Sequence, residues 1–210
     1  MILLSSMTIF CVLDYFLNFF GFKGNYYLIH FFLNLFVIYT TLPELLLSYY
    51  YPYQEGLHIL STCNSIIGLH LYHIIWYYNK LRFDDWLHHI LMIFVVMPLS
   101  IVLEGGYILG HGLFFLTGLP GCIDYLLLFL VRNDMLEKHT EKYYNRLINL
   151  WIRCPGCIAT STLIILQNNK REFDLSTYII SWLVSLLVFW NGIYFMEQVV
   201  SDYAIKYKKN

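Results

Sequence analysis

Seven long apolar runs follow one another along the chain, and short segments rich in glycine, proline and charged residues separate them. About 20 residues of helix cross the hydrocarbon core of a membrane. A helix satisfies its own backbone hydrogen bonds in lipid, and the runs lack the strict alternation of a membrane barrel. The predicted membrane-spanning helices cover residues 2–22, 26–50, 56–79, 85–103, 107–131, 144–167 and 175–200.

The composition is typical of a protein that crosses the membrane several times. Of the 210 residues, 59% are hydrophobic and 13% are charged, whereas about a quarter of the residues in a soluble domain are charged. No linker or repeat divides the chain, so we predict one all-α transmembrane bundle over residues 1–210. The net charge of −1 provides no basic excess to neutralise phosphates, which argues against a nucleic-acid partner.

The first apolar run is interrupted by Asp14 and Asn18. It also lacks a basic leading segment and a cleavage site made of small residues. We therefore predict a retained membrane helix rather than a signal peptide. Loss of this helix from the membrane would move the N-terminus to the other side and leave the C-terminal tail in place.

Lysine and arginine are distributed unevenly between the connecting segments. In membrane proteins the cytoplasmic loops carry the excess of these residues. The even-numbered loops contain only Lys170 and Arg171. We predict that the odd-numbered loops and the C-terminus are cytoplasmic and that the N-terminus is lumenal or outside. The odd-numbered side carries Lys23, Lys80, Arg82, Arg132, Lys138, Lys142, Arg146, Lys206, Lys208 and Lys209.

The chain ends in Lys206-Tyr207-Lys208-Lys209-Asn210. Lysines at the third and fifth positions from the end match the K-x-K-x-x signal, by which receptors return proteins to the endoplasmic reticulum. A lysine cluster that marks the cytoplasmic side of a membrane is the alternative interpretation. Both interpretations require a cytoplasmic tail, and we predict residence in the endoplasmic reticulum.

Asp85, His88 and His89 lie at the start of the fourth predicted helix. Ionisable side chains inside a membrane are costly and are commonly functional. The spacings of three and four residues bring Asp85 close to both histidines. A carboxylate that accepts an imidazole N–H orients the ring and raises the basicity of its other nitrogen, which suits a base, a nucleophile or a metal ligand. Alternatively, Asp84 or Asp85 only caps the helix.

Two adjacent residues of a helix point about 100° apart, so one histidine is expected to face a cavity while the other packs against a neighbouring helix. His70, His73 and Asp124 lie at a similar depth and are predicted to converge with the pair. Structural hydrogen bonding is the alternative for His70 and His73. For Asp124 the alternative is an ion pair with Arg153. His111 lies near the opposite end of its helix and is excluded from the group.

Five cysteines lie within the apolar runs, and we expect no disulfide framework from them. Cys154-Pro-Gly-Cys157 has the spacing of a redox motif. In this apolar setting, the preferred interpretation is a proline and glycine break in a membrane helix, which such helices tolerate. A redox or metal role is the alternative.

The stretch Gly68-Leu-His-Leu-Tyr72-His-Ile-Ile-Trp-Tyr and the following Asp85-Trp-Leu-His88-His89-Ile resemble the central signature of the TLC-domain family, which includes ceramide synthases. Phe114-Phe-Leu-Thr117-Gly-Leu-Pro120 is similar to a later Ser/Thr-Pro segment of that family. Two features depart from the pattern. His73 stands where the family has an acidic residue, and a downstream acidic cluster is replaced by Gly110-His111-Gly112 and Asp124.

The resemblance implies a lipid-handling membrane protein that transfers an acyl group from acyl-CoA to a lipid amine. It implies His88 or His89 as the base or acyl acceptor, with Asp85 as the third catalytic residue. The implied partners are a membrane lipid and acyl-CoA, with no metal and no further cofactor. The predicted substrate-binding residues are His70, His73, Tyr72 and Asp124.

Three other functions compete with acyl transfer. The missing acidic cluster favours a non-catalytic lipid sensor or transfer protein. A metal-dependent membrane hydrolase would use the four histidines and an aspartate, although their spacing follows no known zinc motif. A seven-helix receptor or photoreceptor ranks last. Residues 175–200 contain no lysine, which excludes a retinal Schiff base there, and the loops are very short for a receptor.

Overall fold

The computed structural model of the protein describes residues 2–54, 59–81, 83–103, 105–170 and 172–206. All regular elements in these ranges are helices, which confirms the predicted all-α class. The α-helices are α1 (Ile2–Phe19), α2 (Asn25–Tyr50), α3 (Leu60–Tyr77), α4 (Phe83–Leu91), α5 (Met97–Val102), α6 (Tyr107–Leu113), α7 (Leu119–Arg132), α8 (Lys138–Ile148), α9 (Cys154–Asn168) and α10 (Leu175–Lys206). A short 3-10 turn, η1 (Tyr78–Lys80), follows α3, and the π-helical turns are η2 (Met92–Val96), η3 (Phe114–Gly118) and η4 (Asn149–Arg153).

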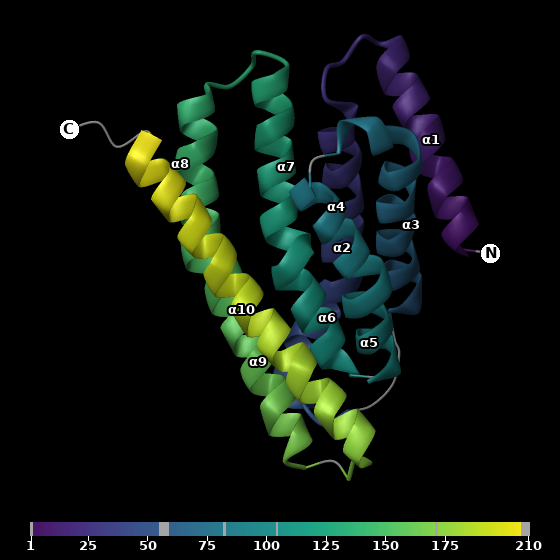
Figure 1. The fold of residues 1–210 in the computed structure, drawn as a ribbon, viewed down its shortest axis with the longest axis vertical. Coiled ribbons are helices and arrows are strands. Elements are labelled where there is room, and N and C mark those ends of the chain that lie inside the picture. Colours follow the sequence, from purple (N-terminus) through teal and green to yellow (C-terminus); the bar gives the residue numbers. More distant parts are fainter. Residues whose placement is uncertain (1, 55–58, 82, 104, 171, 207–210) are drawn as a thin grey trace.

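Each π-helical turn joins two α-helices into one continuous rod. Successive rods run in opposite directions and form a bundle (Figure 1). Five rods are long and apolar enough to cross a membrane by length and composition, which supports a multi-pass membrane protein. Those five are Asn25–Tyr50, Asp85–Val102, Tyr107–Arg132, Lys138–Asn168 and Leu175–Lys206. Helices α1 and α3, with 18 residues each, are not among them.

The π-helical turns follow from prolines. Pro98, Pro120 and Pro155 each lie two residues after the end of a π-helical turn. A proline inside a helix has no N–H to donate, and its ring clashes with the carbonyl four residues earlier. Widening the preceding turn relieves this clash without breaking the rod.

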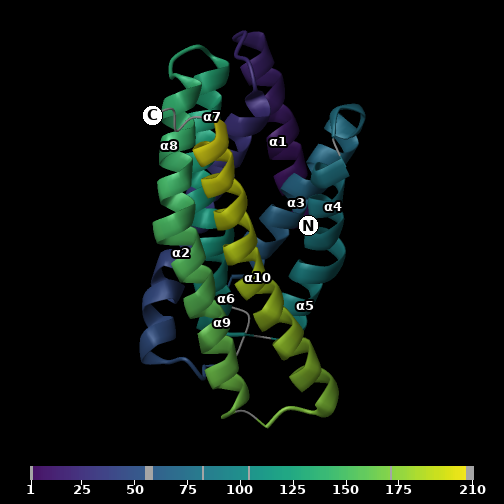
Figure 2. The same cartoon turned by 60° about the vertical axis from the view of Figure 1, so that its left-hand side comes forward.

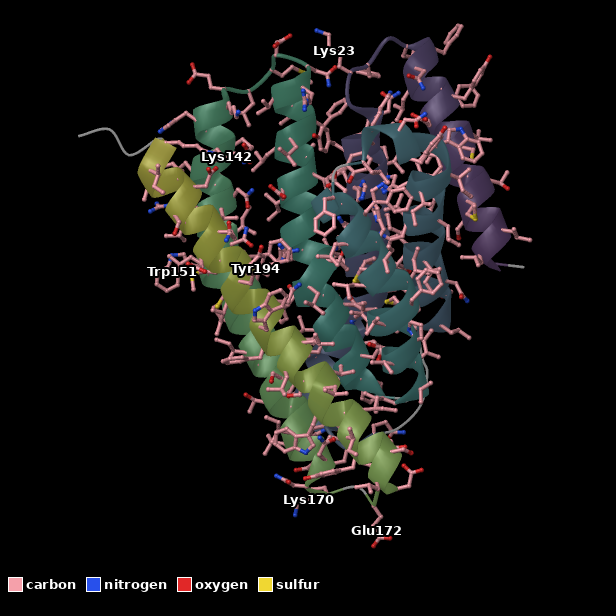
Figure 3. All side chains as sticks on the ribbon, in the orientation of Figure 1. Lys23, Lys142, Trp151, Lys170, Glu172 and Tyr194 are labelled. Carbon is pink, nitrogen blue, oxygen red and sulfur yellow. The ribbon has the colours of Figure 1, made fainter. Side chains whose placement is uncertain are left out.

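Loops at one end of the bundle are linked directly. The Lys23 N–H donates to Asn133 Oδ1 at 3.0 Å, and Asn133 Nδ2 donates to the Lys23 carbonyl at 2.9 Å. Figure 3 shows Lys23 and Lys142 toward this end, and Lys170 and Glu172 at the opposite end. The ends are hereafter called the Lys23 end and the Lys170 end.

The start of α10 is fixed by a capping side chain. Asp174 Oδ1 accepts the backbone N–H of Thr177 at 2.7 Å and the hydroxyl of Ser176 at 3.1 Å. An aspartate that accepts first-turn N–H groups is a favoured N-cap. Hydrogen bonds from Thr177 and then Ser176 lower the pKa of the Asp174 carboxyl. From this cap α10 runs obliquely across α9 toward the Lys23 end (Figure 2).

Two apolar clusters hold the rods together. The first joins α1, α2 and α3 and includes Phe10, Ile29 and Tyr72. The second joins α5, α6, α9 and α10 and includes Cys157 and Val188. Many large apolar side chains instead face outward, which is unfavourable in water and suits a surface in contact with lipid.

Cys154-Pro-Gly-Cys157 lies at a close approach of helices. A Cβ on Gly156 would overlap the ring of Phe115 in η3. A Cβ on Gly192 of α10 would come within 2.6 Å of the Cys157 Cβ. Both cysteines are free and buried. The structure therefore favours the interpretation as a packing and helix-break element, since small residues let membrane helices pack closely.

Candidate functional site

Five histidines from three rods form one group, called here the imidazole cluster. They are His30 of α2, His70 and His73 of α3, and His88 and His89 of α4. The ring centroid of His70 lies 5.1 Å from that of His88 and 5.0 Å from that of His89. The predicted convergence of the paired histidines with His70 and His73 is therefore present in the structure.

His89 is held inside the protein by His70. It is 1% exposed, and its Nδ1 lies 2.7 Å from the Nδ1 of His70. One of these nitrogens must donate and the other accept, so two neutral rings hold opposite tautomers. His89 Nε2 has no hydrogen-bond partner among the described residues. His89 is therefore a buried side chain that links α4 to α3.

His88 has a different environment from its neighbour. Its side chain is exposed and lines a cavity between the rods. One nitrogen from each of His70, His88 and His89 lies within 4.8 Å of the others, so the three rings together could hold a metal ion. His89 also lines this cavity, although its side chain is buried. The expectation that the two histidines have different environments is met, whereas the expectation that only one of them faces a cavity is not.

His73 and His30 continue the imidazole cluster toward α2, and His30 also lines the cavity. Their rings stack with centroids 4.4 Å apart, and His30 also stacks on Tyr125 at 4.0 Å. His30 Nδ1 lies 2.7 Å from the Tyr26 carbonyl oxygen, to which it donates. Neither ring nitrogen of the buried His73 has a hydrogen-bond partner within the described ranges. His73 thus supports the cluster from behind, since it does not appear in the described cavity wall.

The cavity has a volume of about 630 Å³, within the usual range of small-molecule sites. Most of its ionisable and amide side chains lie in the half toward the Lys23 end or near mid-height. Besides His70, His88 and His89, this half is lined by Tyr26, His30, Asn34, Asp85, Asp124, Tyr125, Asn145, Asn149, Arg153, Tyr194 and Gln198. Figure 3 places Tyr194 of α10 at mid-height in the bundle.

The opposite half of the cavity is mainly apolar. Its wall toward the Lys170 end includes Met97, Leu103, Ile108, Leu109, Leu113, Ile164, Val184 and Val188. Ser100, Thr160, Gln167 and Ser181 add polar groups to this mainly apolar half. A cavity that is more polar toward one end and more apolar toward the other suits an amphiphile.

Asp85 lines the cavity one helical turn before the paired histidines. This position agrees with the predicted role of orienting an imidazole, which stays a prediction. The side chain of Asp84, the other candidate cap of this helix, lies outside the described part of the chain.

Arg153 and Asp124 also line the cavity, but the predicted ion pair between them is not present among the described residues. Arg153 NH2 donates to the Leu116 carbonyl at 2.7 Å, and NH1 donates to Asn149 Oδ1 at 3.4 Å. The guanidinium carbon lies 5.0 Å from the centroid of the Phe195 ring. Neutral groups therefore hold the arginine in place of a carboxylate.

Polar side chains continue from Arg153 toward the Lys23 end, four residues apart along one rod. Asn149 Nδ2 donates to Asn145 Oδ1 at 2.6 Å, and Asn145 Nδ2 donates to Glu141 Oε1 at 3.4 Å. Glu141 is 1% exposed and lies 3.5 Å from the Lys142 ammonium. Residues four apart share one helix face, so these side chains form a polar stripe.

Two polar residues lie away from the imidazole cluster. Tyr72, a predicted substrate contact, is fully buried, and its ring packs 6.2 Å from that of Phe10 in α1, away from the described cavity wall. His111 is fully buried near the Lys170 end, as its exclusion from the cluster expected. It bonds Tyr49 Oη at 2.9 Å and Thr160 Oγ1 at 2.7 Å.

The sequence-based prediction missed several residues of the site. His30 occurs alone in the second apolar run, and its depth near the start of that run was the available signal. Asn145 and Asn149 occur at four-residue spacing with Arg153, a second available signal. Tyr125 follows Asp124 directly, but no pattern in the sequence indicated its stacking on His30.

Comparisons of the chain with models of protein families, with curated proteins and with solved structures give no match. The chemistry of the cavity is therefore the basis for assigning a function.

Proposed function

We propose that the protein processes a lipid inside the membrane, by transferring an acyl group from acyl-CoA to a lipid amine. The observation that carries this proposal is the cavity of about 630 Å³, with imidazoles toward the Lys23 end and mostly apolar side chains toward the Lys170 end. An acyl chain fits the apolar half, where burial of each CH₂ group contributes about 0.8 kcal/mol. Its reactive head then lies beside the imidazole cluster.

His88 is the residue proposed to meet the substrate, because it is exposed to the cavity while His89 is buried. As a general base it would take a proton from the attacking amine while the nitrogen bonds to the thioester carbonyl carbon. The carbon–sulfur bond then breaks, and the proton passes to the leaving thiolate. Asp85 would orient the ring, and His70 with His89 would fix the helix that presents it.

The test uses purified protein in lipid vesicles, with a labelled acyl-CoA and a long-chain amine. His88→Ala is expected to abolish formation of the labelled amide. His139→Ala is a matched control, because His139 is an exposed histidine of α8 beside Tyr203. Turnover by His88→Ala equal to that of the unchanged protein would overturn the proposal. Co-purified lipid without any consumption of acyl-CoA would instead indicate a lipid sensor or transfer protein.

The TLC-like signature supports this reaction class, since Gly68–Tyr77 and Asp85–Ile90 carry the resemblance. We also propose seven membrane-spanning helices with the odd-numbered loops in the cytoplasm, where acyl-CoA is available. The lysine-rich loops favour this orientation. Residence in the endoplasmic reticulum rests on Lys206, Lys208 and Lys209, and the last two lie outside the described residues.

A second candidate is a zinc-dependent membrane hydrolase. The supporting observation is that nitrogens of His70, His88 and His89 lie within 4.8 Å of one another. Zinc ligands at about 2.0–2.1 Å from the ion lie about 3.3 Å apart, so small side-chain rotations would form a three-histidine site. Stoichiometric zinc in purified protein, lost in His70→Ala, would favour this candidate. Acyl transfer that persists without metal would reject it.

A further inference from the structure

Arg153 is a cation in the middle of a membrane-crossing rod. The rod Lys138–Asn168 has 31 residues, and Arg153 is 15 residues from either end, or about 22 Å along the helix. A charge at such a depth is costly and normally has a partner in the protein interior. In the described residues, its partners are the Leu116 carbonyl, the Asn149 amide and the Phe195 ring. None of these groups compensates the charge.

The position of the guanidinium is fixed by a proline on another rod. Pro120 has no N–H to donate to the carbonyl four residues earlier, which belongs to Leu116. That carbonyl accepts Arg153 NH2 at 2.7 Å instead. Arg153 Nε is buried and has no partner within the described ranges. The arginine is therefore held by one edge and keeps donor capacity for a ligand.

Asp124 supplies the complementary group. Its Oδ1 is buried without a hydrogen-bond partner among the described residues, and its side chain lines the same cavity. The turn η4, which carries Arg153, packs against α7, which carries Asp124. The carboxylate and the guanidinium thus line one cavity, which His88 also lines, and among the described residues they form no ion pair with each other.

We infer that Arg153 and Asp124 form a two-point site for a lipid head group that carries both an anionic oxygen and an N–H or O–H donor. The anionic oxygen accepts from the guanidinium, and the donor group bonds to Asp124 Oδ1. An isolated anion or an isolated amine satisfies only one of the two groups. This inference deepens the proposed function, on which it rests for the choice of a lipid, by naming the class of head group bound beside His88.

The surroundings of the pair agree with a head group. Asn145 and Asn149 extend the polar wall from Arg153 toward the Lys23 end. Leu113 and Val188 line the cavity on the other side of the pair, toward the Lys170 end. A lipid in this position keeps its head among polar groups and its chain among apolar ones, so neither half is placed in an unfavourable environment.

Binding is measured on purified full-length protein in detergent with three single-chain probes. Oleoyl lysophosphatidylethanolamine carries both an anion and an ammonium group, oleate carries the anion alone, and oleylamine carries the ammonium alone. The unchanged protein is expected to bind the first probe most tightly. Arg153→Gln is expected to lower the affinity for the two probes with an anion, lysophosphatidylethanolamine and oleate, about tenfold or more. Asp124→Asn is expected to lower the affinity for the two probes with an ammonium group similarly.

Arg132→Gln is a matched control, because Arg132 is an exposed arginine at the end of α7, outside the described cavity wall. Arg153→Lys keeps the charge and loses the planar fork, so its affinity for the anionic probes is expected to be intermediate. If Arg153→Gln does not fold, Arg153→Lys carries the test. Unchanged affinities in the folded Arg153 and Asp124 variants would overturn the inference, as would equal binding of all three probes.

The binding assay also separates this inference from the proposed reaction. His88→Ala is expected to abolish amide formation and to keep its affinity for lysophosphatidylethanolamine within about threefold of the unchanged protein. If head-group binding depends on Arg153 but the protein shows no acyl transfer, the proposed reaction is rejected and the head-group site stands. If the protein transfers acyl groups but binds the probes equally well with and without Arg153, the head-group site is rejected and the reaction stands.

Discussion

Adjacent histidines at the start of α4 occupy two different environments because successive residues of a helix point about 100° apart. His89 is buried and meets His70 at 2.7 Å, whereas His88 is exposed, although both line the cavity. We therefore expect the buried His89 to contribute mainly to stability and the exposed His88 to contact the substrate. The two contributions can be measured independently.

We predict that His89→Ala destabilises the protein more than His88→Ala. Removal of the buried ring leaves His70 without its partner, which costs about 1–3 kcal/mol, and it also leaves a void. His88 is exposed, so its removal disturbs the packing less. Thermal unfolding in detergent measures the difference. Equal melting temperatures of the two variants would contradict this division of roles.

A second residue-scale prediction concerns His111, which links α2 and α9 through Tyr49 and Thr160. His111→Phe keeps most of the ring volume and removes both hydrogen bonds. We expect a loss of about 1–3 kcal/mol in the free energy of unfolding, with little effect on the affinity for lysophosphatidylethanolamine. Denaturant unfolding and the binding assay measure these two quantities. A binding defect without a stability defect would show that His111 belongs to the ligand site.

At the level of elements, prolines shape the cavity through the backbone. The π-helical turn η3 ends two residues before Pro120, and the Leu119 N–H bonds the Phe114 carbonyl five residues earlier. The widened turn and the absent proline N–H together leave the Leu116 carbonyl available to Arg153. A backbone feature of one rod thus positions a charged side chain of another.

Pro120→Ala is predicted to weaken this arrangement. The new N–H competes with Arg153 for the Leu116 carbonyl, and a hydrogen bond to a charged group contributes about 1.5–3 kcal/mol. We expect weaker binding of oleate than in the unchanged protein, together with an increased unfolding temperature, because a helical hydrogen bond is restored. Pro98→Ala is the control, since Pro98 follows the π-helical turn η2 of a different rod and does not face Arg153 through the Leu116 carbonyl. Oleate affinity unchanged in Pro120→Ala would show that the carbonyl does not position the arginine.

The sequence predicted the elements better than the site. Apolar runs placed the ends of the rods close to their observed positions, as at Asn25–Tyr50 against the predicted 26–50. Helical depth also brought His70 close to His88. The ion pair of Asp124 with Arg153 was wrong, because its prediction assumed that the nearest opposite charge satisfies an arginine. A carbonyl freed by a proline on another rod is a tertiary feature, and no spacing within one helix indicates it.

For the whole molecule, the course of the chain constrains how it lies in a membrane. Helix α2 and the rod Asp85–Val102 run in the same direction, from the Lys23 end to the Lys170 end (Figure 1). Helix α3 must therefore return the chain across the bundle. Its His70 and His73 lower its apolar character, but both are buried in the protein. An inward-facing polar residue does not prevent a helix from crossing lipid.

We therefore predict that the two ends of α3 lie on opposite sides of the membrane, and that Lys23 and Lys142 share a side. Single cysteines are introduced as Gln54→Cys, Lys80→Cys, Lys142→Cys and Lys170→Cys in a Cys11→Ala background, and closed microsomes are treated with a membrane-impermeant maleimide. Positions 80 and 142 should react in intact microsomes, whose outer face is cytoplasmic. Positions 54 and 170 should react only after permeabilisation.

The Cys11→Ala chain without an added cysteine is the control, because the four remaining cysteines are buried in the bundle. A reaction at positions 54 and 80 from the same side would mean that α3 does not cross the membrane. Labelling of position 170 in intact microsomes, with position 142 protected, would reverse the orientation and place the polar half of the cavity toward the lumen. In that case acyl-CoA from the cytoplasm would not reach His88 directly, and the acyl-transfer proposal would fail together with the predicted topology.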